Sequence, residues 1–139
     1  MYQYGAGTSY VSPPIIGKDR LTTPTYDAIK RQQYIFDSYY RDILDKIYLT
    51  DVYHVGHIYN PSKRFCEDEY ILDVNGKHSY PTIISYYKEY GGEEKWISFV
   101  NAHQRFANRL TVTLKNGNKK TLWLASGEMY IEKLSEFLK

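Results

Sequence analysis

The spacing of apolar and polar positions changes along the chain, and the first regular stretch has a helical period. It begins at Thr23-Pro24, which supplies a capping hydroxyl and a proline suited to the first helical position. Acidic residues precede basic residues by four positions three times in this stretch, as stable helices favour. The pattern therefore predicts a long helix over residues 24–46, and its apolar stripe consists of Ile29, Phe36, Tyr40, Ile43, Leu44 and Ile47.

From Ile47 onward the period changes to that of strands, with many β-branched and aromatic residues. Asn75-Gly76 and Asn116-Gly117 each predict a two-residue hairpin turn, because both residue types tolerate positive φ. Around the second turn the alternation predicts one apolar strand face, with Trp123 on the opposite face. That apolar face consists of Leu110, Val112, Leu114, Leu122 and Leu124.

The last elements complete an α+β prediction. Residues 93–101 carry apolar side chains on both faces, as a central or interfacial strand does. Ser126 is positioned to cap a short C-terminal helix over the following residues. We expect a mostly antiparallel, hairpin-built sheet between the two helices. In the order of its elements the chain resembles pleckstrin-homology-like barrels, which implies that the sheet can close into a small barrel; the resemblance implies no site residue.

The first 23 residues differ from the rest, since they mix Gly, Ser, Thr and Pro without a sustained period. We interpret residues 1–23 as an extended docking arm and residues 24–139 as one α+β domain. A tail that stays disordered would be poorer in aromatic residues. The arm packs on its own domain or docks on a neighbouring subunit, through the interface candidates Tyr2, Tyr4, Tyr10, Ile15 and Ile16.

Composition favours a protein that works by contact. Tyrosine occurs 16 times, and its amphipathic ring suits surfaces that are partly buried and partly wet. The lone Cys66 excludes an intramolecular disulfide, and the N-terminal residues lack a secretory signal pattern. No apolar run approaches the roughly 20 residues that span a bilayer. We therefore expect an intracellular or virion-bound protein that is not secreted and has no membrane partner.

Charge is unevenly distributed, although the formal net charge is only +2. No acidic residue lies between Glu94 and Glu128, whereas acidic residues cluster at positions 67–73. The basic segment can face phosphates, face the acidic segment of a second copy, or simply be a solvated strand face.

The connection at residues 101–109 is the best candidate binding site, because it concentrates amide, imidazole and guanidinium groups in a loop. With the lysines that follow, it gives ligand- or phosphate-binding candidates: Asn101, His103, Arg105, Asn108, Arg109, Lys115, Lys119 and Lys120. The alternative is a polar loop whose arginines pair with residues 67–73.

Other chemistries find little support. His54 and His57 lie three apart, so on a regular strand they point to opposite faces unless Gly56 forms a bulge, and we expect no metal. Cys66 is surrounded by carboxylates, which dull a thiol nucleophile. We expect no cofactor and assign no catalytic residue.

The leading hypothesis is therefore a non-enzymatic interaction or structural domain that assembles with itself or with a larger complex, such as a phage or viral component or a small inhibitor. Trp123 joins the arm residues as an interface candidate. The first alternative is a nucleic-acid- or nucleotide-binding protein that uses the basic 105–120 segment. The second is a phosphodiesterase-like enzyme centred on His103.

Overall fold

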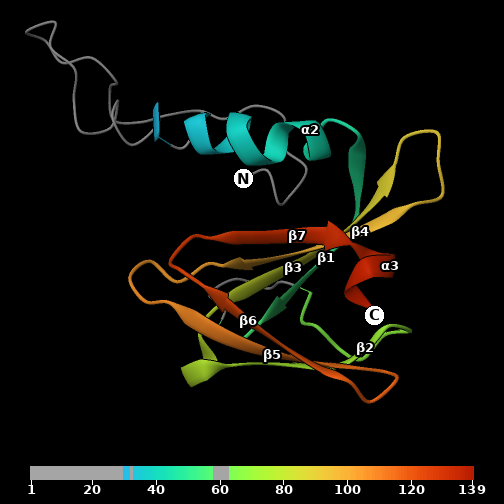
Figure 1. The fold of residues 1–139 in the computed structure, drawn as a ribbon. Helices are drawn as coiled ribbons and strands as arrows, with labels where there is room; N and C mark the ends of the chain where they lie inside the picture. Colours follow the sequence, from blue (N-terminus) through green and yellow to red (C-terminus); the bar gives the residue numbers. More distant parts are fainter. Residues whose placement is uncertain (1–29, 32, 58–62) are drawn as a thin grey trace, which may run out of the picture.

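The computed structural model describes residues 30–31, 33–57 and 63–139, and within them two antiparallel sheets face each other (Figure 1). One sheet has the order β1-β3-β4-β7 and the other the order β2-β5-β6. The first consists of β1 (Ile47–Val55), β3 (Thr82–Glu89), β4 (Lys95–Asn101) and β7 (Met129–Lys133). The second consists of β2 (Ile71–Gly76), β5 (Asn108–Leu114) and β6 (Lys119–Leu124).

The core lies between the two sheets, because alternate side chains of each strand point inward. Ile84, Ile97 and Phe99 enter it from the four-stranded sheet, and Leu110 and Val112 from the three-stranded sheet. The short helix α3 (Leu134–Phe137) closes one end by inserting Leu134 and Phe137. The Phe137 ring lies 5.4 Å from the Phe99 ring, centroid to centroid. Burial of these large apolar side chains is the main stabilising contribution to the fold.

A hairpin forms at Asn116-Gly117 as predicted, but its loop has three residues, 115–117, where two were expected. Gly117 adopts a φ of 89°, and the backbone N–H of Leu114 donates to the carbonyl oxygen of Asn118 at 2.8 Å. β5 and β6 pair across this turn, with Leu110 opposite Leu122. Leu110, Val112, Leu114 and Leu124 are buried, as the alternation predicts. The alternation selects this register, since a two-residue loop at Asn116-Gly117 would instead place Leu110 opposite Trp123.

The prediction of a long helix over residues 24–46 is wrong in the part of that range that the structure describes. Residues 30–31 and 33–35 are helical, a π-helical turn η2 (Phe36–Tyr40) follows, and α2 (Arg41–Leu44) is a last short turn. The N–H of Arg41 donates to the carbonyl of Phe36, five residues back, and this shifts the stripe around the helix axis. No residue of α2 is buried. Residues 24–29 lie outside the described part.

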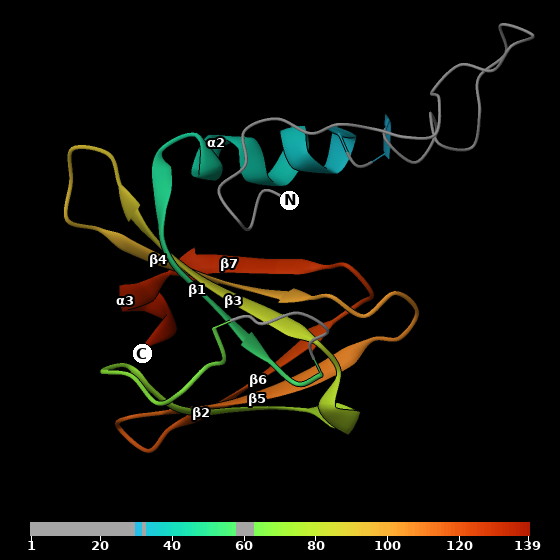
Figure 2. The same ribbon diagram turned by 180° about the vertical axis from the view of Figure 1, so that it is seen from behind.

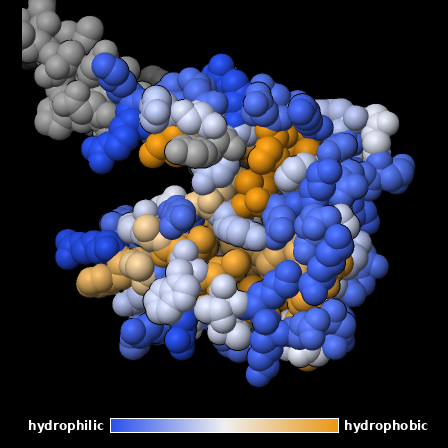
Figure 3. All heavy atoms as spheres, viewed as in Figure 1, coloured by the Kyte–Doolittle hydropathy of each residue, from blue (hydrophilic) through white to orange (hydrophobic). Residues whose placement is uncertain are grey.

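This helical segment crosses the four-stranded sheet on the side away from the three-stranded sheet (Figures 1 and 2). The Tyr40 hydroxyl donates to the carbonyl oxygen of Met129 on β7 at 2.7 Å. In the space-filling view the outward surface of the segment is mostly hydrophilic, and hydrophobic residues gather between it and the strands (Figure 3).

The hairpin expected at Asn75-Gly76 is also wrong. β2 pairs with β5, and β3 pairs with β1 and β4, so the chain changes sheets at this point. Gly76 has an extended backbone, and the 3-10 turn η3 (Lys77–Ser79) leads into β3. Tertiary pairing overrides the local turn preference here, because β2 buries Ile71 and Val74 against the opposite sheet.

The C-terminal helix expected from Ser126 begins later, since residues 129–133 form β7 and pair with β4. The Ser126 hydroxyl donates to the carbonyl oxygen of His103 instead of capping a helix. Of the expected helix, only the four residues of α3, which starts at Leu134, are helical. The β-branched and aromatic residues of the 129–133 segment complete a sheet edge more favourably than they form a helix turn.

These findings correct the predicted fold class. Among residues 30–31, 33–57 and 63–139 the structure is mostly antiparallel β, its helices are short, and the sheets do not close into a barrel. No ladder joins β1 to β2 or β6 to β7, so two open sheets pack face to face. No helix in the described part of the chain is long and apolar enough to cross a membrane.

Candidate functional site

Three segments that are distant in sequence meet at one end of the sandwich and line a pocket of about 410 Å³. They are residue 57 after β1, residues 78–81 directly before β3, and residues 102–105 after β4. We call this site the histidine pocket. Its walls are His57, His78, Ser79, Tyr80, Pro81, Ala102, His103, Gln104 and Arg105.

A glycine permits this convergence. Gly56 has a φ of +81°, and a Cβ at this position would lie 2.4 Å from the carbonyl oxygen of Tyr80. Without a side chain the backbone approaches closely enough for the His57 N–H to donate to the carbonyl oxygen of Ser79 at 2.9 Å. On the other side the Ala102 N–H donates to the carbonyl oxygen of Pro81 at 3.0 Å. Backbone hydrogen bonds therefore hold all three walls together.

The His103 ring has a defined orientation. Its Nδ1 accepts hydrogen bonds from the backbone N–H groups of Arg105 and Phe106, both at 3.0 Å. A nitrogen that accepts carries no proton, so the neutral ring has its proton on Nε2. The His103 ring centroid lies 4.4 Å from that of Tyr80. His103 is thus a hydrogen-bond donor fixed against the aromatic wall of the pocket.

Asn101 and Asn108, predicted as ligand-binding residues, are fully buried and hold the loop instead. The Asn101 amide donates to the carbonyl oxygens of Phe106, Leu124 and Ala125 at 2.8, 3.1 and 3.2 Å, and its Oδ1 accepts from the His103 N–H. The Asn108 amide donates to the Thr82 hydroxyl at 3.2 Å. Both amides are therefore used inside the protein.

The remaining basic candidates are dispersed. Arg105 lines the histidine pocket, whereas the Arg109 guanidinium lies 5.5 Å from the Trp123 ring on the other sheet. Lys115 pairs with Glu67 at 2.9 Å, so the basic and acidic segments meet within the chain through a lysine, whereas the predicted pairing involved the arginines of residues 101–109. The Lys120 ammonium lies 4.9 Å from the Phe137 ring centroid. Residues 105–120 therefore do not form one continuous basic surface.

The exposed surface of the three-stranded sheet carries Arg109, Lys119 and Trp123 together. Trp123 is 69% exposed, as its place opposite the buried leucines predicts. The strand pairing places Asp73, Thr113 and Lys119 in one row across the three strands. We call this surface the outer face, and it consists of Asp73, Asn75, Arg109, Thr111, Thr113, Lys119, Thr121 and Trp123.

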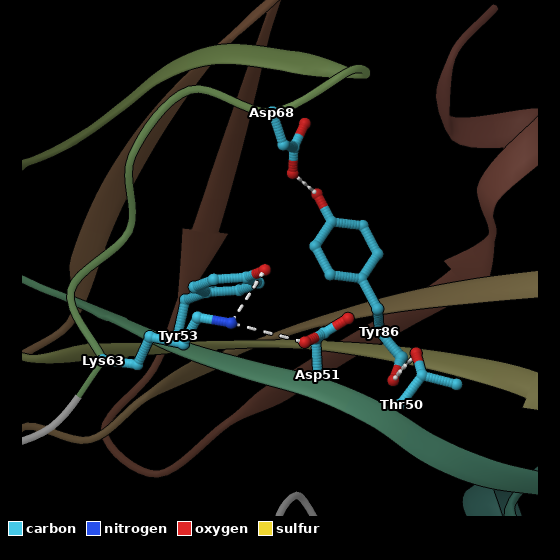
Figure 4. A network of polar contacts seen from close by, with 6 residues as sticks. All are labelled: Thr50, Asp51, Tyr53, Lys63, Asp68 and Tyr86. Atoms are coloured by element: carbon cyan, nitrogen blue, oxygen red, sulfur yellow. Dashed lines mark hydrogen bonds and ion pairs between the residues drawn. The ribbon is translucent and has the colours of Figure 1, made fainter.

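A second cavity, of about 360 Å³, was not predicted from the sequence. Its lining includes tyrosines from several elements. Figure 4 shows its polar contacts: the Tyr86 hydroxyl donates to Asp68, and the Lys63 ammonium lies near Tyr53 and Asp51. Asp68 also accepts the backbone N–H groups of Tyr70 and Ile71, at 2.8 and 2.7 Å. These hydrogen bonds join residues 63 and 68, which precede β2, to side chains of β1 and β3.

Burial raises the pKa of Tyr86 far above its usual range, and the hydrogen bond to Asp68 raises it further. Burial likewise raises the pKa of Tyr130, to about 12, with a hydrogen bond to Glu132 as the second cause. Only the high count of tyrosines was visible in the sequence. Which of them are buried and paired depends on packing between strands.

The five arm residues predicted as interface candidates, Tyr2, Tyr4, Tyr10, Ile15 and Ile16, lie outside the described residues. Within residues 30–31, 33–57 and 63–139, no group of three or more His, Cys, Asp or Glu side chains is arranged to hold a metal ion. Cys66 is exposed and not in a disulfide.

Comparison with known proteins supplies no family for this arrangement. No protein-family model, curated protein or solved structure matches the chain.

Proposed function

We propose that the chain is a non-enzymatic interaction domain that assembles with a second copy of itself through the outer face of its three-stranded sheet. The observation that carries the proposal is Trp123, whose large ring is 69% exposed on a rigid hairpin beside the Arg109 guanidinium. Tryptophan and arginine are the residue types most enriched at the energetic centres of protein interfaces. A monomer gains nothing in its own core from a tryptophan in this position.

The charges of the outer face support pairing with an identical face. Lys119 lies on the edge strand β6 and Asp73 on the opposite edge strand β2, and both are in the row of Thr113. Consider two outer faces packed together about a two-fold axis parallel to β5. This operation exchanges the two edges and keeps each row, so Lys119 of each copy faces Asp73 of the other. Two complementary ion pairs then flank the interface.

The same operation places Trp123 of each copy opposite the C-terminal end of β2 in the other copy. Thr111 and Thr121, with small hydroxyl side chains, lie between the charged row and Trp123, and Thr113 lies in the charged row itself. Such a surface is flat, and close approach is limited by the tryptophan and the long basic side chains alone. The Trp123 ring, on the edge strand β6, is therefore the large apolar group that self-association removes from water.

Sedimentation velocity over a range of protein concentrations tests the proposal. We expect the wild-type chain to exceed its monomer mass of 16.4 kDa as concentration rises. Trp123→Ala should weaken association by about 2 kcal/mol, roughly 30-fold in Kd, as expected for an interface hot spot. A wild-type protein that stays monomeric at every concentration contradicts the proposal.

A charge exchange gives the sharper test of geometry. Lys119→Asp and Asp73→Lys should each weaken association, because each places like charges opposite one another. The double variant restores both pairs and should recover most of the wild-type affinity. Lys46→Asp, the same change just before β1 in the other sheet, is the matched control and should leave association unchanged. Failure of the double variant to recover would exclude the proposed two-fold arrangement.

A further inference from the structure

We infer that the histidine pocket binds a phosphomonoester, in particular a mononucleotide, with Arg105 and His103 holding the phosphate. The pocket lies at the end of the sandwich and shares no residue with the outer face. This inference and the proposed self-association therefore stand or fall separately.

The charge of the pocket favours an anion. Its nine described lining residues include three imidazoles and one guanidinium, and none of the nine is a carboxylate. The guanidinium of Arg105 is always charged, and its planar fork of N–H donors matches the oxygens of a phosphate. With one fixed positive charge and no carboxylate among these nine residues, the concave site is electrostatically suited to an anion.

His103 adds a donor whose direction is fixed. Because two backbone N–H groups occupy Nδ1, the proton of the neutral ring is on Nε2, the nitrogen that they leave available. Asn101 holds the loop below it through the 3.0 Å contact from the His103 N–H to Oδ1. A buried side chain therefore orients the donor before any ligand arrives, which lowers the entropic cost of binding.

The wall beside these donors is aromatic. The rings of Tyr80, His103 and Phe106 form one cluster: the His103 centroid lies 4.4 Å from that of Tyr80 and 5.1 Å from that of Phe106, and the Tyr80 and Phe106 centroids lie 6.1 Å apart with an interplanar angle of 17°. Phe106 is 56% exposed, so its ring has a surface on which a flat heterocycle can stack. Stacking of a base on an aromatic side chain contributes about 1 to 3 kcal/mol. Hydrogen-bond donors to a phosphate, next to an aromatic surface on which a base can stack, together match the chemistry of a nucleotide.

Backbone strain is concentrated at the same place. His78 and Ser79 both have a φ of 55°, in the left-handed region that residues with a side chain seldom adopt. The described part of the chain has no other non-glycine residue with positive φ. Each such residue costs of order 1 to 2 kcal/mol, and the strain persists where surrounding structure fixes it, often at binding sites. Here it turns the His78 segment into the pocket wall.

Other ligand classes fit less well. The three imidazoles do not form a metal-holding group within the described residues. A carboxylate that fills the Arg105 fork uses both its oxygens there, whereas a phosphate keeps a further oxygen for the His103 Nε2–H donor. Single-stranded nucleic acid would require a track of cations beyond the pocket, and Lys115 is already paired with Glu67. A volume of about 410 Å³ is in the range of small-molecule sites.

Isothermal titration of the full-length wild-type protein tests the inference with four probes: AMP, adenosine, ribose 5-phosphate and inorganic phosphate. We expect AMP to bind most tightly, the two phosphates without a base to bind more weakly, and adenosine to bind at least about tenfold more weakly than AMP. AMP affinity should decrease as salt rises. Equal affinity for adenosine and AMP would overturn the assignment of the phosphate to this pocket, as would the absence of AMP binding.

Variants then locate the site. Arg105→Ala should weaken AMP binding about tenfold or more, which is the effect of losing a charged hydrogen-bond donor. Arg109→Ala is the matched control, because its guanidinium lies on the outer face, and it should bind AMP like the wild type. His103→Asn keeps an acceptor near the Nδ1 position while it removes the Nε2 donor, so it should weaken AMP several-fold without disrupting the loop. Phe106→Ala should weaken AMP and leave inorganic phosphate unchanged.

Two results with these variants would overturn the inference. If Arg105→Ala and Arg109→Ala weaken binding equally, the anion is held by general surface charge. If single-stranded oligonucleotides bind more tightly than AMP and both arginine variants reduce that binding, the ligand is nucleic acid on a wider surface. Arg105 and Phe106 are exposed, and thermal unfolding of each variant verifies that the fold is retained.

Discussion

Replacing Tyr86 by phenylalanine tests whether a buried hydroxyl makes the fold sensitive to alkaline pH. The Tyr86 side chain lies in the core between the sheets, and its hydroxyl donates to Asp68. Burial raises the pKa of this hydroxyl far above the ordinary tyrosine value of 10.0. The folded protein therefore keeps the proton at a pH where the unfolded chain has lost it.

The sign and size of the effect follow from proton linkage. Since the folded pKa is the higher one, the stabilisation is complete below pH 10 and is lost as pH rises above it. For one such group the free energy of unfolding falls by about 1 kcal/mol between pH 10 and pH 11, and by about 1.4 kcal/mol for each further unit. Tyr86→Phe cannot ionise and lacks this loss. At neutral pH it costs about 1.5 kcal/mol, because Asp68 loses a donor.

Urea unfolding followed by circular dichroism at neutral pH, pH 10 and pH 11 measures both quantities. We expect the stability difference between wild type and Tyr86→Phe to shrink by about 1 kcal/mol between pH 10 and pH 11. Tyr90→Phe, at a side chain that is 68% exposed, is the control for the loss of any tyrosine, and should change stability by less than about 0.5 kcal/mol at neutral pH. Parallel decline of wild type and Tyr86→Phe above pH 10 would refute the reasoning.

Two further predictions concern the residues that build the histidine pocket. Asn101→Ala removes the four hydrogen bonds of a fully buried amide, so it should lower the free energy of unfolding by about 3 to 4 kcal/mol in urea titrations; a loss below about 1 kcal/mol would contradict the structural role assigned to it. Gly56→Ala places a Cβ 2.4 Å from the Tyr80 oxygen and should cost about 3 kcal/mol, measured in the same way. Its control is Gly117→Ala, which has a φ of +89° but no atom within 4 Å, and should cost about 1 kcal/mol from backbone strain alone.

The parts of the fold that the sequence predicts correctly depend on neighbouring residues. The leucine alternation predicts the strand register correctly over a short stretch, and a hairpin forms at Asn116-Gly117, although its loop has three residues in place of two. The same dipeptide at Asn75-Gly76 fails, because β2 finds its partner in β5, more than 30 residues later. A local turn signal contains no information about which sheet the next strand joins. For that reason the sequence predicted one hairpin-built sheet where there are two.

The candidate site shows the same limit. His103 and Arg105 were identified because they are close in sequence and lie in one loop. His57 and His78 were not assigned to it, since their approach depends on the Gly56 backbone passing against Tyr80. Asn101 and Asn108 were assigned to a ligand because an amide in a polar loop looks available, and only their complete burial reveals that they pair with the protein. The sequence signal for the kink is the glycine next to His57, because glycine tolerates a positive φ.

The alternation of the chain between two sheets also determines how the protein acquires its structure. In chain order, β1 belongs to the four-stranded sheet, β2 to the three-stranded sheet, β3 and β4 to the four-stranded sheet, β5 and β6 to the three-stranded sheet, and β7 to the four-stranded sheet again. Neither sheet can therefore be completed from a contiguous piece of the chain, and most of the entropic cost of closing loops comes before the core forms. We expect slow folding, in milliseconds to seconds, as for other β proteins of high contact order. On the ribosome the early strands would have to wait with their apolar faces uncovered, so synthesis is the stage at which this protein is most exposed to aggregation.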